Sequence, residues 1–345
     1  MKKFFVLLIL LFSISACSKQ DNGKLPSEKQ IDKTQPEPEG YKSAHQRDYE
    51  KYKKKKNLNP DSVEAVSTIA LTEISEGKFY HPKISANGEY LFFTSQNYQG
   101  LWVKRTDGGN VVRLSSGRGA GYKFVVSPDG KKVFYRLRIK GSKSHKTGFS
   151  LIMQNVNSGK IEIIASSEQR ISPPVLVGNE VVYFIDGQLL RKKVLKYNLG
   201  KSEEVLQFNG KVFKVSKDTV KELNLNEKNI LSLELSPVSE EILFSVRGKG
   251  IYVFNKGNKV YIDSGENPVW SPDGKLIAYT KEKSDGMRIK ETKIFIASVL
   301  PVKIFKTNLA GEYPVWHPGG RHLVYSDSNG KILQTEINLV YKEEK

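Results

Sequence analysis

The stretch NPVWSPDGKLIAYTK (residues 267–281) reads as a short strand, a tight turn and a second strand. Proline fixes φ and removes a hydrogen-bond donor at the end of the first strand, aspartate caps the turn, and glycine supplies a positive φ. YPVWHPGGRHLVYSD (313–327) repeats it with Pro, Trp, Pro and Gly in step, and looser copies lie at 122–136 and 80–94. The stretch is therefore one copy of an internal repeat.

The repeat has the period of a propeller blade. The residues before the turns, which we call anchors, are Ser85, Ser127, Val175, Ser236, Ser271 and His317, of which the third and fourth are weak matches. Their intervals are 42, 48, 61, 35 and 46 residues, and the mean of about 46 is the length of one four-stranded blade. No segment after Val66 has a helical period. The sequence predicts an all-β, six-bladed β-propeller of four-stranded antiparallel blades over residues 66–345.

The last repeat has fewer strands than the four of a complete blade. Only one or two follow its hairpin, so VSTIALTEI (66–74) is expected to supply the missing outer strand and to close the ring by joining the two ends. We expect Trp270 and Trp316 in the core between blades. Asp129 and Asp273 are expected to be turn residues rather than metal ligands.

Two longer stretches carry a family resemblance. WSPDGKLIAY (270–279) and LWVKRTDGGNVVRLS (101–115) resemble the repeat of the TolB-type six-bladed β-propellers, over about residues 66–345. The resemblance implies the fold, and it leaves function open because protein-binding, peptidase-associated and polysaccharide-lyase proteins share this repeat. TolB itself has an α/β domain before its propeller. Here a 48-residue segment occupies that place, so the resemblance is to the repeat and not to the whole of TolB.

The N-terminus resembles a bacterial lipoprotein signal. Lys2 and Lys3 precede an apolar run at 4–12, about half of the roughly 20 residues that a membrane span needs, and ISAC (14–17) follows. The resemblance to a lipobox implies that 1–16 are removed and that Cys17 is lipidated; an uncleaved anchor or a chance cysteine is the alternative. Because Cys17 is the sole cysteine, no disulfide is expected. Ser18 implies, by the sorting rule of Gram-negative lipoproteins, a lipid anchor in the outer membrane that faces the periplasm.

Residues 17–65 are predicted to be a flexible tether. They contain PEPEG and KKKK (53–56), few apolar side chains and no alternation. The capping-box spacing of SAHQ (43–46) predicts a short helix up to Lys56. The lysine run is either a solvated face or a contact with anionic lipid or cell-wall polymer.

The sequence offers no catalytic constellation. It has no Gly-x-Ser-x-Gly motif, and none of its five histidines has zinc-ligand spacing with a carboxylate partner. His317 and His322 flank one hairpin turn, and we expect them on the surface. We predict no enzyme activity, cofactor or metal site; a metal-assisted lyase in the propeller mouth is the enzyme alternative.

The chain is strongly basic. Its formal net charge is +18, of which +14 belongs to the propeller, and its pI is about 9.6. Nucleic acid is excluded as the expected partner because the signal predicts export. An acidic envelope protein, lipid head groups or cell-wall polymers remain as partners, and charge that serves solubility alone is the plainer alternative.

Strand geometry predicts where a partner binds. The starts of the innermost strands and the loops between second and third strands should share one face, because antiparallel strands alternate in direction. Between Gly130 and Ile161 there is no acidic residue. The predicted partner-binding residues on this mouth face are Tyr80, His81, Tyr122, Lys123, Arg136, Arg138, Lys140, Arg170, Glu266, Asn267, Glu312 and Tyr313, with Ile171, Leu231, Ser232, Lys143, Lys146, Arg247 and Lys249 nearby.

Tyrosines mixed with basic side chains are typical of a protein-binding surface. The sequence thus predicts a lipid-anchored, cell-envelope scaffold that binds a protein through its central mouth. A polysaccharide-binding or lyase propeller, or an accessory subunit of an envelope complex, is the alternative.

Overall fold

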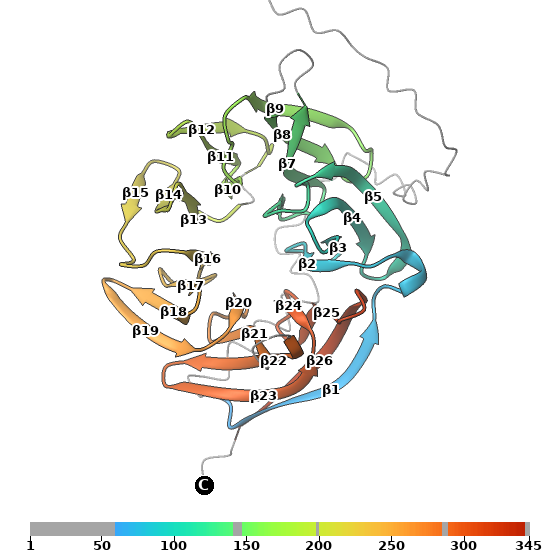
Figure 1. Ribbon diagram of the computed structural model, residues 1–345, viewed down its shortest axis with the longest axis vertical. Helices are drawn as coiled ribbons and strands as arrows, with labels where there is room; N and C mark the ends of the chain where they lie inside the picture. The colour runs from blue at the N-terminus through green and yellow to red at the C-terminus, as the bar shows by residue number, and fades with distance from the viewer. Residues whose placement is uncertain (1–58, 141–146, 198–199, 285–288, 342–345) are drawn as a thin grey trace, which may run out of the picture.

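The computed structural model describes residues 59–140, 147–197, 200–284 and 289–341. In these residues the strands form seven antiparallel sheets arranged around a central axis (Figure 1). The helical structure found there is the short 3-10 turn η1 (Ile74–Glu76). Within this part of the chain, no helix combines the length and the hydrophobicity that crossing a membrane requires. The predicted all-β propeller is confirmed.

Five of the sheets are four-stranded blades, numbered along the chain from the inside outward. Blade 1 is β2 (Tyr80–Ile84), β3 (Tyr90–Thr94), β4 (Gln99–Arg105) and β5 (Gly108–Arg118); blade 2 is β6 (Val125–Val126), β7 (Lys132–Lys140), β8 (Thr147–Asn155) and β9 (Ile161–Ser167). Blade 5 is β16 (Ile230–Leu235), β17 (Ile242–Val246), β18 (Gly250–Asn255) and β19 (Asn258–Asp263). Blade 6 is β20 (Glu266–Trp270), β21 (Leu276–Ser284), β22 (Ile289–Val299) and β23 (Val302–Ala310). Blade 7 is β24 (Glu312–Trp316), β25 (His322–Ser326), β26 (Ile332–Val340) and β1 (Ser62–Ala70).

Two adjacent blades have three strands each. Blade 3 is β10 (Val175–Val177), β11 (Glu180–Ile185) and β12 (Gln188–Lys193), and blade 4 is β13 (Glu203–Phe208), β14 (Lys211–Ser216) and β15 (Val220–Leu223). The predicted count of six blades is therefore wrong, and the ring has seven. The error lies in the 61-residue interval before Ser236, which holds both short blades. Val175 also fails as an anchor, because it begins β10 and the turn follows at Gly178.

Blade 4 runs in the opposite sense to the others. The backbone N–H of Gly178, in the first turn of blade 3, donates to the Lys201 carbonyl at 2.8 Å, so β13 starts beside that turn. At its other end, the Phe208 ring stacks on Phe184, near the far end of β11, with centroids 5.0 Å apart. After the three strands of blade 3, the chain lies at the opposite end of the ring from the one where the other blades begin. The three strands of blade 4 bring it back, so blade 5 begins at the usual end.

We call the two ends of the ring the turn face, which carries the Ser-Pro-Asp-Gly turns, and the mouth face. In those turns, the Ser127 and Ser271 hydroxyls donate to Asp129 Oδ1 at 2.5 Å and to Asp273 Oδ1 at 2.6 Å. The backbone N–H groups two residues later, of Lys131 and Lys275, donate to the same carboxylates. Both aspartates are turn residues, as predicted.

The N-terminal strand closes the ring. β1 pairs antiparallel with β26 from Ser62↔Val340 to Ala70↔Leu333, and the two ends of the described chain lie side by side at the rim (Figure 1). The prediction of closure is confirmed, although the strand begins four residues before the predicted position 66. Pairing of β1 gives blade 7 its fourth strand.

Apolar side chains fill the spaces between neighbouring blades. One cluster joins blades 6 and 7 through Ile294, Trp316 and Leu323, and another joins blades 5 and 6 through Ile251 and Trp270. Both tryptophans are buried, as predicted. The predicted surface position of His317 is wrong, because its side chain is 8% exposed and its Nδ1 accepts the Gly319 N–H at 3.1 Å.

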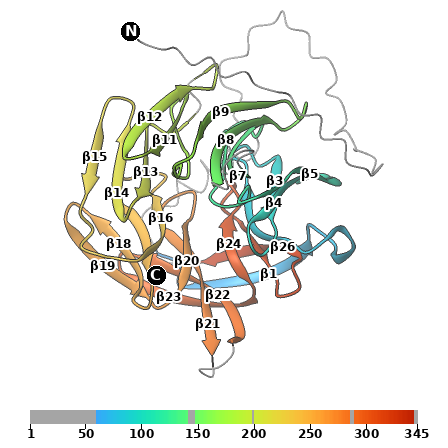
Figure 2. The ribbon, with the colours of Figure 1, turned by 45° about the horizontal axis from the view of Figure 1, so that its top comes forward.

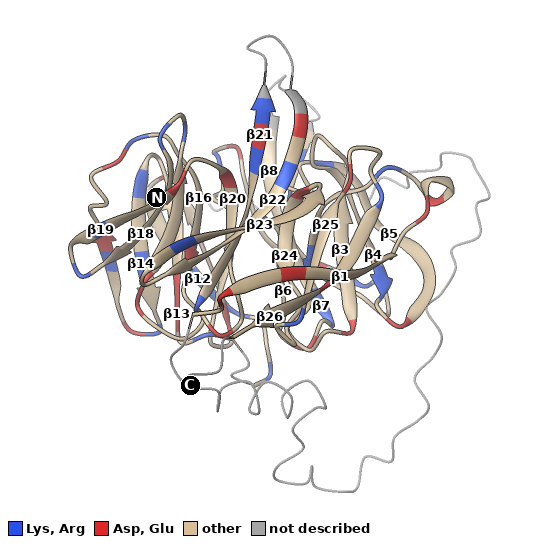
Figure 3. Ribbon diagram, turned by 90° about the horizontal axis from the view of Figure 1, so that it is seen from below, with Lys and Arg blue, Asp and Glu red and all other residues tan. Residues whose placement is uncertain are grey.

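One hairpin of blade 6 stands out from the mouth face. β21 and β22 are nine and eleven residues long, whereas the strands of neighbouring blade 5 have five or six. Seen obliquely and from the side, this hairpin extends beyond the rest of the ring (Figures 2 and 3).

Candidate functional site

The innermost strands of blades 1, 6 and 7 each open with the same bulge. Two residues of the inner strand face one residue of its neighbour, with register shifts between Tyr80 and Lys83, Glu266 and Val269, and Glu312 and Val315. The first bulged residues, His81, Asn267 and Tyr313, have φ of 52°, 53° and 54°. Each precedes a proline, which has no N–H to lose from the ladder. A positive φ costs a non-glycine residue about 1–3 kcal/mol, so the arrangement is held by its surroundings.

Two of the bulged residues, His81 and Tyr313, take part in a row of rings across the mouth, which we call the aromatic line. The His81 ring lies 3.7 Å from the Tyr313 ring and 4.2 Å from the Tyr98 ring, between centroids. Tyr98 meets Tyr122 edge to face at 5.1 Å. The Arg136 guanidinium lies 5.4 Å from the Tyr122 centroid, which ends the line on blade 2. Three blades thus contribute to one aromatic surface.

Protein surrounds the His81 imidazole. Burial lowers the pKa of His81 from 6.5 to about 4, and a backbone hydrogen bond with Gln96 opposes this shift. Its buried Nε2 has no hydrogen-bond partner in the described part of the chain. A neutral ring at the centre of the aromatic line is the result at neutral pH.

This histidine should make stability depend on pH. The folded pKa of about 4 lies below the unfolded value of 6.5, so the unfolded chain binds more protons between these values and acid favours unfolding. We expect the free energy of unfolding to fall by on the order of 2 kcal/mol more in wild type than in His81→Phe between about pH 7 and 4.5. Urea unfolding of both proteins at each pH measures this, and parallel pH profiles would contradict it.

The basic residues gather at the blade 2 and 3 side of the mouth; we call Lys123, Arg136 and Arg170 the basic cluster. Arg136 is 8% exposed, and its Nη1 donates to the Ile171 carbonyl at 2.6 Å. Burial, with a contribution from Arg170, lowers the pKa of Arg136 to about 10. The pKa of Lys123 is lowered by burial and then by the charges of Arg136 and Arg170. Lys123 Nζ reaches across the axis to the Leu231 carbonyl of blade 5, 3.5 Å away.

An acidic cluster lies on the opposite side, on blades 6 and 7. It comprises Glu266, Glu282 and Glu312, and burial together with the charges of the other two raises the pKa of Glu282. Burial, and then Glu312, raises the pKa of Tyr313 as well. The aromatic line therefore begins beside carboxylates and ends beside a guanidinium.

The turn-face end of the channel also carries charge. Lys83 of blade 1 donates to the Phe124 carbonyl at 3.2 Å, and Glu234 of blade 5 accepts from the backbone N–H of Trp270 at 3.1 Å. The side chain of Lys83 is exposed on the innermost strand β2, but the surrounding blades enclose it. Burial lowers the pKa of Lys83 and raises that of Glu234. Glu204 of blade 4 and Lys201 act on both groups. Blades that are not neighbours thus interact through the channel.

The structure brings together most of the predicted mouth residues. Tyr80, His81, Tyr122, Lys123, Arg136, Arg170, Glu266, Asn267, Glu312 and Tyr313 lie at the mouth end of their blades. Arg138 is exposed on β7, with its guanidinium 5.8 Å from the Phe149 centroid. The side chain of Lys140, and Lys143 and Lys146, lie outside the described part, as do Cys17 and the predicted tether helix.

Two expectations about this surface are corrected. The sequence groups Arg136 with Arg138 as a partner-binding residue of the mouth, yet Arg136 lies buried on β7, because its side chain reaches the Ile171 carbonyl next to blade 3. Lys249 does not add free positive charge, since its ammonium forms a 2.7 Å ion pair with Glu227.

Two residues of the mouth were missed. Tyr98 is in the β3–β4 turn, and Glu282 is on the long β21 strand. The rule that places loops between second and third strands on the mouth face applies to both, so the sequence held a signal for them. Among the described residues, no group of three or more His, Cys, Asp or Glu side chains is placed to hold a metal ion.

No protein-family model matches the sequence, and neither does any curated protein sequence. Solved structures are similar to it at low identity. The β-propeller domain of Myceliophteria thermophila Cps50 (Swd1) has a TM-score of 0.51 and 11% identity, covering 79% of this chain and 100% of that one. A chain of the mitotic checkpoint complex has a TM-score of 0.51 and 14% identity, with 91% and 99% covered. TolB from Acinetobacter baumannii has a TM-score of 0.43 and 16% identity over 77% of this chain, which spans 65% of that one. At these identities the likeness shows one thing, that the chain is a β-propeller.

Proposed function

We propose that this chain is a cell-envelope scaffold, anchored through a lipid on Cys17 in the outer membrane and facing the periplasm, that binds a protein at its mouth. The observation that supports binding is the aromatic line between two clusters of opposite charge. Tyrosine and arginine are the side chains on which binding energy concentrates at protein interfaces. A surface polarised in this way selects both the partner and its orientation.

The geometry specifies the partner further. A carboxylate-bearing part of the partner lies against Lys123 and Arg170, and a basic part lies against Glu266 and Glu312. Between them, apolar or aromatic side chains pack on Tyr98, Tyr122 and Tyr313.

Crosslinked capture from solubilised envelopes tests the proposal. Alanine at Tyr98 and Tyr313 should speed dissociation of the captured protein about tenfold at every salt concentration. Arg138→Glu with Arg170→Glu, both exposed, should instead slow association, and the effect should shrink at about 1 M salt, where the Debye length is roughly 3 Å.

The matched control is Lys256→Glu with Lys275→Glu, two exposed lysines on the turn face, which changes net charge by the same amount. If the variants on both faces slowed association equally, net charge alone would attract the partner. Cys17→Ser in the same experiment should move the protein out of the membrane fraction, and persistence there would remove the anchoring claim.

A further inference from the structure

The face of the β21–β22 hairpin that is turned toward blade 5 carries a row of lysines. Ile277 and Tyr279 of β21 pack against blade 5, and the alternation of a strand places Lys281 and Lys283 on the same face. Across the sheet, Lys281 stands opposite Lys293, and Phe295 stands opposite Lys306.

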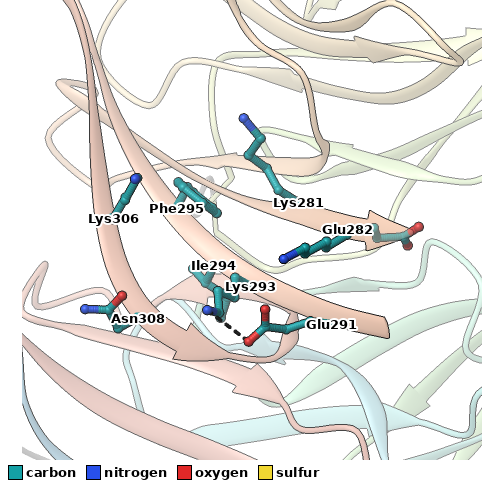
Figure 4. A pocket seen from close by; sticks show the side chains of 9 residues that line it. Lys281, Glu282, Glu291, Lys293, Ile294, Phe295, Lys306 and Asn308 are labelled. Atoms are coloured by element: carbon teal, nitrogen blue, oxygen red, sulfur yellow. Dashed lines mark ion pairs between the residues drawn. The ribbon is translucent and has the colours of Figure 1, made fainter. Parts of the chain in front are cut away.

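This face is open because blade 5 ends early. Its outermost strand β19 stops at Asp263, whose carboxylate accepts from Lys281 Nζ at 2.9 Å, while β21 continues to Ser284. Beyond that contact lies a cavity of about 400 Å³ (Figure 4). Its wall contains four lysines, the two carboxylates Glu282 and Glu291, Ile294, the half-buried Phe295 and Asn308 of β23.

The charges in the cavity do not cancel. Lys281 is paired with Asp263, and Lys293 forms a 2.9 Å ion pair with Glu291. Glu291 also stands opposite Lys283 across the sheet, but its carboxylate pairs with Lys293. Within the described part of the chain, no ion pair forms at Lys283 or Lys306. Glu282 points away from the lysine groups (Figure 4), toward the acidic cluster of the mouth. Two free ammonium groups and one amide thus face a common space.

We propose that this cavity binds a small anionic sugar, that is, a sugar ring with a phosphate or carboxylate substituent. Lysine binds either anion as a point charge. The space is far larger than an inorganic anion fills, since a water molecule takes about 30 Å³, and the lower range of ligand pockets begins at about 300 Å³. Asn308 supplies an amide for hydroxyl groups. Phe295 supplies apolar contact for the sugar ring beside Lys281, whose Nζ lies 5.2 Å from the Phe295 centroid. The site lies outside the mouth and is independent of the partner proposed there.

Calorimetric titration of the whole chain with glucose 6-phosphate, glucuronate, inorganic phosphate and neutral glucose tests this site. Wild type should bind at least one charged sugar more tightly than glucose and than phosphate, and the better of the two sugars identifies the anion. The double variant Lys283→Gln with Lys306→Gln should bind that sugar with an affinity about tenfold or more lower.

Lys256→Gln with Lys275→Gln makes the same change in net charge on the turn face and should alter the affinity less than about twofold. Thermal unfolding of both double variants shows that the fold is kept. Binding of neither charged sugar above glucose, or equal losses in the two double variants, would overturn the site. Neither result bears on the mouth, which the capture experiment tests separately.

Discussion

Deletion of β1 (Ser62–Ala70) is expected to destroy the cooperative fold of the propeller. β1 is the outermost strand of blade 7, and its loss exposes the edge of β26 along nearly its whole length. It also removes Val63, which is 7% exposed in the cluster that joins blades 6 and 7, and the Thr68–Thr335 hydroxyl contact of 2.7 Å. Lost ladder bonds at about 1 kcal/mol each and one buried valine make a deficit of about 5 kcal/mol or more, comparable with the whole stability of many domains.

Thermal unfolding and light scattering measure this outcome. The deletion should aggregate, because an unpaired strand edge is a template for another chain. Deletion of residues 20–58, which precede the described propeller, is the control and should leave the melting temperature unchanged. If both truncations behave alike, the pairing of β1 with β26 does not hold the ring together.

Arg136→Ala should destabilise the fold by about 3 kcal/mol. The substitution leaves the buried Ile171 carbonyl without its 2.6 Å donor and empties the space of a side chain that is 8% exposed. An unsatisfied polar group costs about 1–3 kcal/mol when buried, and the cavity left by the side chain adds to this loss. Part of the loss is offset, because Arg136 Nε is buried without a hydrogen-bond partner in the described part of the chain. Chemical unfolding in urea measures it.

Arg138→Ala is the matched control, two residues along the same strand. Its guanidinium is exposed beside Phe149, and exposed substitutions of this kind change stability by less than about 0.5 kcal/mol. Similar losses in both variants would mean that the Arg136 contact with Ile171 contributes nothing to stability.

The sequence was enough for the fold class and for most blades, because turn chemistry is local. Ser-Pro-Asp-Gly and its variants specify a hairpin by themselves, so blades 2 and 6 could be read directly. Blade 4 was missed although it contains a strong signal: Asn209 and Gly210 join β13 to β14 with φ of 49° and 78°, as expected for a two-residue Asn-Gly hairpin. The Ser-Pro-Asp-Gly pattern does not detect this second type of turn.

The mouth could be predicted in part, since strand direction alone places the ends of strands. What the sequence did not contain is the burial of single side chains. Arg136 and Arg138 look alike in a basic stretch, and their difference depends on the neighbouring blade, whose Ile171 carbonyl meets one and not the other. The grouping of acids on blades 6 and 7 opposite the basic cluster likewise depends on closing the ring.

The reversed strand direction of blade 4 implies that this ring needs an even number of three-stranded blades. A blade of four strands returns the chain to the face where it started, whereas a blade of three leaves it on the opposite face. With a single three-stranded blade, every later blade would be inverted, and β26 would meet β1 running in the same direction instead of antiparallel. Three-stranded blades must therefore be gained or lost in pairs if β1 and β26 are to pair antiparallel. Adding one strand to the edge of blade 3 alone, by insertion after β12, should be tolerated only with a matching strand in blade 4.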